Sequence, residues 1–122
     1  MFQQLTLCGR LGSDVEIRFT PSGKAVANFS LATDKHKGGE KGTTWWRIAV
    51  WEAQAENCAK YLSKGATVLV VGELEEPRIW TDKQGNSRVS LEVTARTVRF
   101  IESKGGGVVG EVTIEGATEV EF

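Results

Sequence analysis

Histidine and cysteine are scarce in this chain of 122 residues. It has one histidine, His36, and two cysteines, Cys8 and Cys58, which stand fifty residues apart without a CxxC spacing. A zinc site needs four ligands at close spacing, so we expect no metal and no cofactor. The first residues also lack the features of a secretory signal, and we expect free, buried thiols in a reducing cytoplasm.

Long apolar runs and catalytic motifs are missing as well. No stretch approaches the ~20 apolar residues that a membrane helix needs, so we expect no membrane partner. The sequence has no GxSxG, P-loop or HExxH motif and no paired carboxylates with a matching partner. Asp14 and Glu16 stand beside Arg18 and are interpreted as a solvated strand face. These absences favour a binding protein over an enzyme.

Charge is divided unevenly along the chain. The net charge is −1, yet all fifteen Lys and Arg lie at or before Lys104. Residues 1–104 contain these fifteen basic residues and twelve Asp and Glu, which gives a net charge of +3. Residues 105–122 contain four acidic residues and no basic residue. A body that binds a polyanion and a tail that does not would show this division. A solvated acidic tail without a role explains it equally well.

Alternation of apolar and polar residues predicts that most of the chain is β-strand. We expect strands within residues 4–20, over 25–33, 44–51 and 67–75, ending near Asp82 and starting again near Ser87. Residues 52–63 instead have helical spacing, and Gly65 is a favourable helix stop. Five or six strands with one short helix between the middle ones predict a mostly β, five-stranded Greek-key barrel of the OB type.

Three consecutive glycines, at 105–107, predict the end of the barrel. We expect one OB domain over residues 1–104 and an acidic, flexible tail over residues 105–122. The alternative is that residues 108–122 add a strand to the body or to a neighbouring molecule.

The strand expected over residues 44–51 is the most informative segment. Residues two apart in a strand share a face, so Trp46 belongs to an apolar core face and Trp45, Arg47 and Trp51 to the opposite face. Burying an unpaired Arg47 would be costly. Exposed indoles, by contrast, stack unpaired bases at roughly 1–3 kcal/mol each, and a guanidinium contacts phosphate. This face therefore predicts single-stranded nucleic-acid binding, with a subunit interface as the alternative role of Trp45 or Trp51.

Further aromatic and basic residues extend this prediction. Trp80 stands near the tip of a hairpin over residues 78–86, where an indole flanked by cations fits base stacking, although it could also lie back on its own hairpin. A Lys- and Gly-rich loop over residues 35–43 is expected to be a mobile phosphate contact. The predicted contacts are Trp45, Arg47, Trp51, Trp80, Arg10, Lys35, Lys37, Lys41, Arg78, Lys83 and Arg88.

Several blocks of residues, in order along the chain, resemble the bacterial single-stranded DNA-binding proteins. They include residues 9–12 (GRLG), 18–32 (RFTPSGKAVANFSLA), 44–47 (TWWR), 61–65 (YLSKG), 71–74 (VGEL) and 80–82 (WTD). The resemblance covers residues 2–101. It implies an OB-fold protein of the cytoplasm and nucleoid that binds single-stranded DNA irrespective of sequence in replication, recombination and repair. It also implies a homo-oligomer, commonly a tetramer, with a dimer as the alternative.

The resemblance assigns the family's stacking aromatics to Trp45, Trp51 and Trp80. A further family aromatic falls in the loop after the third strand, where this chain offers only His36 and lysines. We therefore expect three stacking residues per subunit and not four.

The tail departs from the family, which ends in a long Gly/Pro/Gln-rich linker and an acidic tip with a terminal Pro-Phe that docks on replication and repair proteins. Here the linker is about a dozen residues long, and the acidic character and the terminal phenylalanine are kept without the proline. The resemblance implies that Glu119, Glu121 and Phe122 bind such partners. A reduced tail is also expected of a phage-encoded or accessory member.

Two other functions fit the same residues. An OB module that acts mainly on proteins would leave the exposed indoles without a role. An RNA-binding OB domain stays open, because no residue of the sequence decisively recognises a 2′-hydroxyl.

Overall fold

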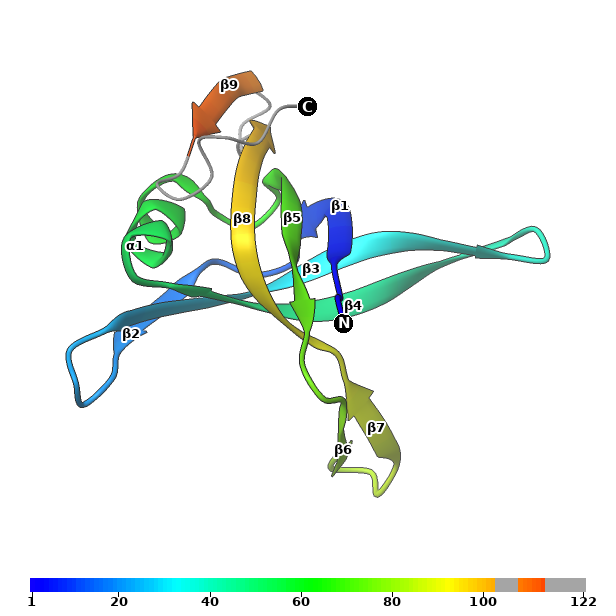
Figure 1. Ribbon diagram of the computed structural model, residues 1–122. Coiled ribbons are helices and arrows are strands. Elements are labelled where there is room, and N and C mark those ends of the chain that lie inside the picture. Colours follow the sequence, from blue (N-terminus) through cyan, green and yellow to red (C-terminus); the bar gives the residue numbers. More distant parts are fainter. Residues whose placement is uncertain (103–107, 114–122) are drawn as a thin grey trace.

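The computed structural model describes residues 1–102 and 108–113 of the chain. Its elements are β1 (Leu5–Leu11), β2 (Glu16–Phe19), β3 (Ala25–Lys37), β4 (Glu40–Trp51), α1 (Glu52–Tyr61), β5 (Thr67–Leu74), β6 (Arg78–Thr81), β7 (Ser87–Ser90), β8 (Glu92–Glu102) and β9 (Val108–Thr113) (Figure 1). The prediction of a mostly β chain with one short helix is confirmed. Within these residues, no helix is both long and apolar enough to cross a membrane.

Five strands close into a barrel. Neighbouring strands follow the order β1-β5-β8-β4-β3, and β1 pairs with β3 to complete the ring. All of these pairs are antiparallel except β4 with β8, which is parallel. This is the predicted Greek-key barrel of the OB type. β2 extends the sheet beyond β3, while β6 and β7 form a separate hairpin that projects from the barrel (Figure 1).

The core lies inside the barrel, as the alternation predicted. The largest fully buried side chains are Leu31, Ile48, Val50, Val68, Val70, Val93, Val98 and Cys58. Helix α1 packs on β3, where Ala55 meets Ala25 and Ala27. Both cysteines are free, but only Cys58 is buried. The expectation of two buried thiols is wrong for Cys8, because its side chain is on the outer, polar face of β1.

The loop expected over residues 35–43 is instead the distal part of one long hairpin. β3 runs to Lys37 and β4 begins at Glu40, which is the Cα partner of Lys37. Gly38 and Gly39 form the two-residue turn with φ values of 60° and 82°. Turns of this kind require positive φ at both central residues and match the twist of the flanking strands. The two glycines therefore serve a hairpin turn and not a mobile loop.

The single strand expected to start near Ser87 is divided at Leu91 into β7 and β8. β7 pairs only with β6, so Val89 leaves the core face and is 60% exposed. Ile17 and Phe19 are exposed as well, because β2 lies at an edge of the sheet. In each case the alternation is present but the strand lies outside the barrel.

The residues after the glycines differ in part from the flexible tail that we expected. Val108–Thr113 forms β9 and pairs with β8 over Arg99–Glu102. β4 pairs with the beginning of β8 only, at Glu92–Thr94, and thus leaves the distal edge of β8 open to another strand. Glu119, Glu121 and Phe122 lie outside the described residues, and the domain boundary at 104 stays a prediction.

Candidate nucleic-acid interface

The outer side of β4 exposes two indoles and a guanidinium. Ile48 and Val50 are fully buried, so Trp45, Arg47 and Trp51 face outward. Trp45 is 55% and Trp51 41% exposed. No ion pair joins Arg47 to any other described residue. The three residues that the sequence assigned to one face do share it.

Strand register adds further cations to this face. Residues directly opposite one another in paired antiparallel strands point to the same side of the sheet. Ala32 is the partner of both Trp45 and Arg10, so Arg10 lies on the side of Trp45. Val26 is the partner of both Trp51 and Arg18, so Arg18 lies on the side of Trp51. We call this surface the aromatic face: Arg10, Gly12, Arg18, Trp45, Arg47 and Trp51.

A hollow on the aromatic face contains two residues that the sequence analysis missed. Its lining is Glu16, Ile17, Arg18, Asn28 and Arg47, and its volume is about 180 Å³. That volume is below the ~300 Å³ of a small-molecule pocket but admits a single charged group. The sequence analysis placed Arg18 on a solvated strand face and did not consider Asn28. The turn that joins β2 to β3, in which Gly23 has a φ of 87°, is a sequence signal for their pairing, but the position of Arg18 near Arg47 depends also on the register of β3 with β4.

Trp46 is less buried than the core position we expected. It packs against the core cluster but is only half-buried, and its indole Nε1 donates a hydrogen bond of 2.9 Å to Thr33 Oγ1. β3 pairs with β4 along its length, whereas β8 pairs with β4 only at Arg47–Ala49, so among the described strands Trp46 has a paired neighbour on one side.

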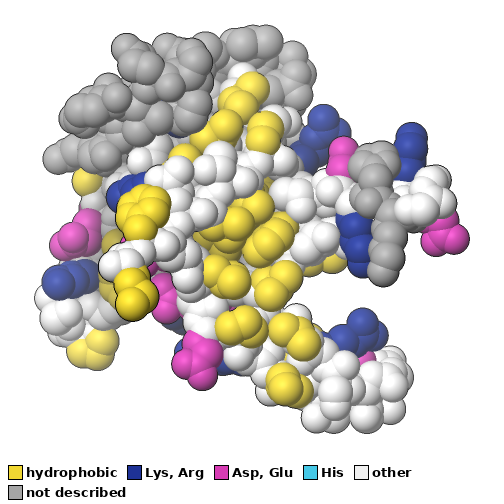
Figure 2. Space-filling model, turned by 45° about the vertical axis from the view of Figure 1, so that its right-hand side comes forward, with side chains coloured by type: hydrophobic (Ala, Val, Ile, Leu, Met, Phe, Trp, Pro, Cys, Tyr) yellow, Lys and Arg dark blue, Asp and Glu magenta, His cyan; other side chains and the backbone are white. Residues whose placement is uncertain are grey.

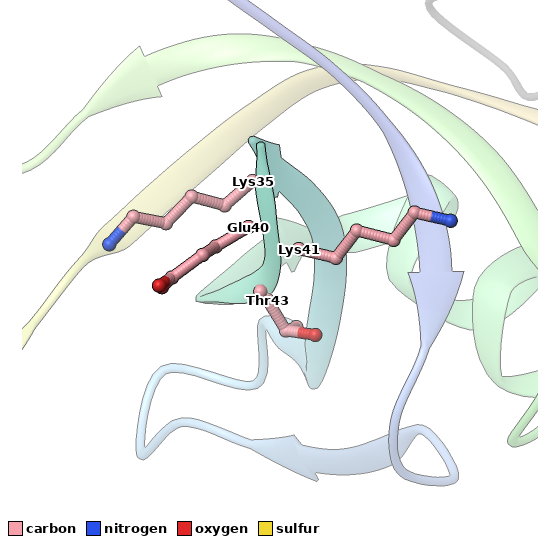
Figure 3. A pocket seen from close by; sticks show the side chains of 5 residues that line it. Lys35, Glu40, Lys41 and Thr43 are labelled. Atoms are coloured by element: carbon pink, nitrogen blue, oxygen red, sulfur yellow. The ribbon is translucent and has the colours of Figure 1, made fainter. Parts of the chain in front are cut away.

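The lysines of the β3–β4 hairpin do not form a single patch. Lys35 and Glu40 extend to one side of the ribbon and Lys41 to the other (Figure 3). Alternation along β4 places Lys41 on the side of Trp45, which leaves Lys35 on the opposite side. The side chain of Lys37 lies outside the described residues. Lys35 and Lys41 therefore do not lie on one side of the sheet, and their contact with phosphate stays a prediction.

Trp80 belongs to the projecting β6–β7 hairpin and not to the aromatic face. It is half exposed and is the Cα partner of Arg88, while Arg78 shares its side of β6. The Asp82 carboxylate accepts 2.9 Å hydrogen bonds from Arg88 Nε and the Asn86 backbone N–H. The guanidinium, with these backbone donors, holds the pKa of Asp82 below its usual range. Arg88 is thus fixed on the hairpin beside Trp80, and Lys83 stands in the turn.

On the face shown in Figure 2, most hydrophobic side chains and most basic side chains lie in different places. Figure 2 shows hydrophobic side chains over the middle of the visible face and on the β6–β7 hairpin below it. Lys and Arg side chains gather on the β3–β4 hairpin at the right. The molecule therefore carries cations on projecting hairpins around an apolar middle, an arrangement that suits a flexible polyanion with flat apolar groups.

Comparisons with known proteins agree with this geometry. The model of the single-strand binding protein family matches residues 2–101. Single-stranded DNA-binding protein A of Bacillus subtilis is 39% identical over 113 residues, which are 90% of this chain and 65% of that protein. Single-stranded DNA-binding protein 3 of Listeria innocua is 34% identical over an alignment of 125 residues, which covers 100% of this chain and 78% of that protein.

A solved structure is similar over most of the barrel. It is the Plasmodium falciparum SSB complex with ssDNA, with a TM-score of 0.68 and 27% identity over 84% of this chain and 97% of that chain. The chain thus spans about two thirds of the length of its Bacillus relative and nearly all of the solved SSB chain. The chain belongs to the single-strand binding protein family.

Proposed function

We propose that this chain binds single-stranded DNA without regard to sequence. The observation that carries the proposal is the pair of half-exposed indoles, Trp45 and Trp51, on one face of the barrel with Arg47, which has no ion pair among the described residues. Large aromatic side chains that remain exposed to water commonly mark a binding surface. Every base has a π-face, so stacking on Trp45, Trp51 and Trp80 tolerates any sequence.

Phosphate contacts come from the cations around these indoles. Arg10, Arg18, Arg47 and Lys41 lie on the side of Trp45 and Trp51, and Arg78 and Arg88 lie beside Trp80. The ends of the two hairpins carry three more lysines, Lys35, Lys37 and Lys83. They attract the DNA electrostatically, and they contact its phosphates if the DNA passes over the hairpin tips. The binding is therefore weakened by salt.

Family membership supports a biological role that we propose as follows. The chain protects single-stranded DNA during replication, recombination and repair, in the cytoplasm and at the nucleoid, and carries out no catalysis. We propose a homo-oligomer, with a tetramer favoured over a dimer. Ile17 and Phe19, exposed on edge strand β2, leave apolar surface for a subunit contact. Glu119, Glu121 and Phe122 are proposed to recruit replication and repair proteins.

Titration with a thymidine oligomer tests the proposal. Tryptophan emission falls strongly on binding, and Trp45→Ala and Trp80→Ala each weaken binding by about 5- to 150-fold, the equivalent of the ~1–3 kcal/mol of one stacked base. Tyr61→Ala, which removes an exposed aromatic from α1, is the control and leaves affinity unchanged. Unchanged emission, or equal affinity for a duplex, refutes the proposal.

Two further measurements complete the test. Competition between thymidine and uridine oligomers separates a DNA-binding from an RNA-binding protein, and a preference for uridine would overturn the assignment to DNA. Light scattering with and without a long thymidine oligomer gives the subunit number and the stoichiometry, and a monomer would overturn the homo-oligomer.

A further inference from the structure

Gly12 leaves space that the side chain of Trp45 occupies. A Cβ atom added to Gly12 would lie 2.3 Å from Cζ3 and 2.8 Å from Cη2 of Trp45. Carbon atoms that are not bonded approach to about 3.5 Å, so a side chain at position 12 and the present indole exclude each other. Gly12 has no left-handed φ, so its backbone conformation does not require glycine. Glycine is needed at position 12 because it has no Cβ atom, and the Trp45 ring occupies the space that a Cβ would fill.

The backbone beneath the indole is fixed. Gly12 N donates a 2.9 Å hydrogen bond to Ser30 O, and Ser30 N donates one of 3.1 Å to Ser13 Oγ. The preceding residue, Leu11, is buried in the core, and its backbone N–H is bonded to Ala66 O. A side chain at position 12 would therefore displace the indole and not the backbone, because the indole is more than half exposed.

These contacts give the indole a defined resting place. The outer edge of its six-membered ring lies beside Gly12, and Trp45 as a whole is 55% exposed. A side chain that is already held in its bound orientation loses less rotational freedom on binding, a loss that otherwise weakens affinity by about 2- to 13-fold. An alanine at position 12 would push the ring outward and release it.

We propose that Gly12 is a positioning residue that holds the Trp45 indole in the orientation in which it stacks a base. The inference rests on the proposed function, because it assumes that Trp45 is a stacking residue. Gly12 acts here through Trp45 and needs no contact with DNA of its own.

Other glycines of the barrel separate this role from a purely structural one. A Cβ on Gly9 would lie 2.3 Å from Ala32 O, and one on Gly72 would lie 2.2 Å from Thr94 O. Those atoms are backbone, so a side chain at either position must displace a strand. At Gly12 the nearest atoms belong to the end of an exposed side chain. On Gly42, in the same β3–β4 hairpin as Trp45, a Cβ would have no neighbour closer than 4.0 Å.

A double-mutant cycle tests the proposal. The variants are Gly12→Ala, Trp45→Ala, the two combined, and Gly42→Ala as the matched control; each is titrated with a thymidine oligomer and melted thermally. We expect Gly12→Ala to weaken binding by about 5-fold or more, but by no more than Trp45→Ala does, and to make tryptophan more accessible to acrylamide. In the Trp45→Ala background the same change alters affinity less than about 2-fold, since residues that act through each other are not additive. Gly42→Ala binds like the unaltered protein.

The outcomes are distinct. Wild-type affinity of Gly12→Ala, or an equal loss in both backgrounds, overturns the proposal. If Trp45→Ala itself binds normally, the stacking role of Trp45 is wrong, and the proposed function loses that contact. If Gly12→Ala does not fold, the combined variant must melt at the same temperature as Trp45→Ala, because it lacks the indole with which the new Cβ clashes. A lower melting temperature of the combined variant also overturns the proposal.

Discussion

Arg18 is a residue whose role can be measured separately from overall affinity. It shares the hollow of the aromatic face with Arg47 and Asn28, and the strand register places it on the same side of the sheet as Trp51. Two guanidinium groups at a hollow of about 180 Å³ suit contact with the phosphate backbone of a strand whose bases lie on the neighbouring indoles. We therefore predict that Arg18→Ala removes a phosphate contact and leaves stacking intact.

The expected magnitude follows from counterion release. Each phosphate neutralised on a single strand adds about 0.7 to the slope of log affinity against log salt. Arg18→Ala should lower that slope by about 0.7, and Arg18→Ala with Arg47→Ala by about 1.4. Over a tenfold rise in salt, the unaltered protein then loses about 5-fold more affinity than the Arg18→Ala variant.

Fluorescence titration with a thymidine oligomer at several salt concentrations measures the slope. Lys60→Ala is the control of equal charge: Lys60 is on α1, with its Nζ 5.3 Å from the ring centroid of Tyr61, and α1 packs on the side of β3 opposite to the aromatic face. Glu16→Gln, in the same hollow, should raise affinity with little change in slope. A slope for Arg18→Ala equal to that of the unaltered protein refutes the reasoning, and an equal decrease with Lys60→Ala would show that net charge alone governs binding.

Two predictions concern stability. Burial raises the pKa of the Cys58 thiol from 9.0 to about 12, so only the unfolded chain ionises as the pH rises above 9. The free energy of unfolding should therefore fall by about 1.4 kcal/mol between pH 8 and pH 10, and melts of Cys58→Ala that show the same fall would contradict this cause. Glu52 begins α1 with a left-handed φ of 58°, a conformation that costs a side chain about 1–2 kcal/mol. Glu52→Gly should thus be about 1–2 kcal/mol less destabilising than Glu56→Gly in the interior of the same helix, whereas equal losses in denaturant titrations would exclude strain at Glu52.

The barrel can be predicted from the sequence because its cause is local. Burial on one side of a strand imposes a period of two, and the fully buried Ile48 and Val50 follow it beside the exposed Trp45 and Trp51. The same rule correctly separates Leu7 and Leu11 from the polar side of β1. It does not say where a strand leaves the barrel, and for that reason Val89 and Trp46 are more exposed than the alternation suggests.

Composition misled the interpretation of residues 35–43. Lysine and glycine are typical of loops, but Gly38 and Gly39 supply the two positive φ values of a tight turn, and the residues on either side pair to the tip. Once the segment is a ribbon, the pleat decides which side each lysine faces. Lys35 and Lys41 are near in sequence and lie on opposite sides, a division that no count of charges can give.

The aromatic face shows the same limit in its supporting residues. Trp45, Arg47 and Trp51 are found from sequence because they are two and four residues apart in one strand, and the pleat brings them together. Gly12 stands 33 residues before Trp45 in the chain. Because β1, β2 and β4 all pair with β3, Gly12 lies beneath Trp45 and Arg18 lies near Arg47. The proposed stacking residues can therefore be named from a local pattern, whereas the residues that we propose to orient an indole or to contact phosphate depend on the register of distant strands. Gly12→Ala and Arg18→Ala test that second set directly, since neither change removes an indole.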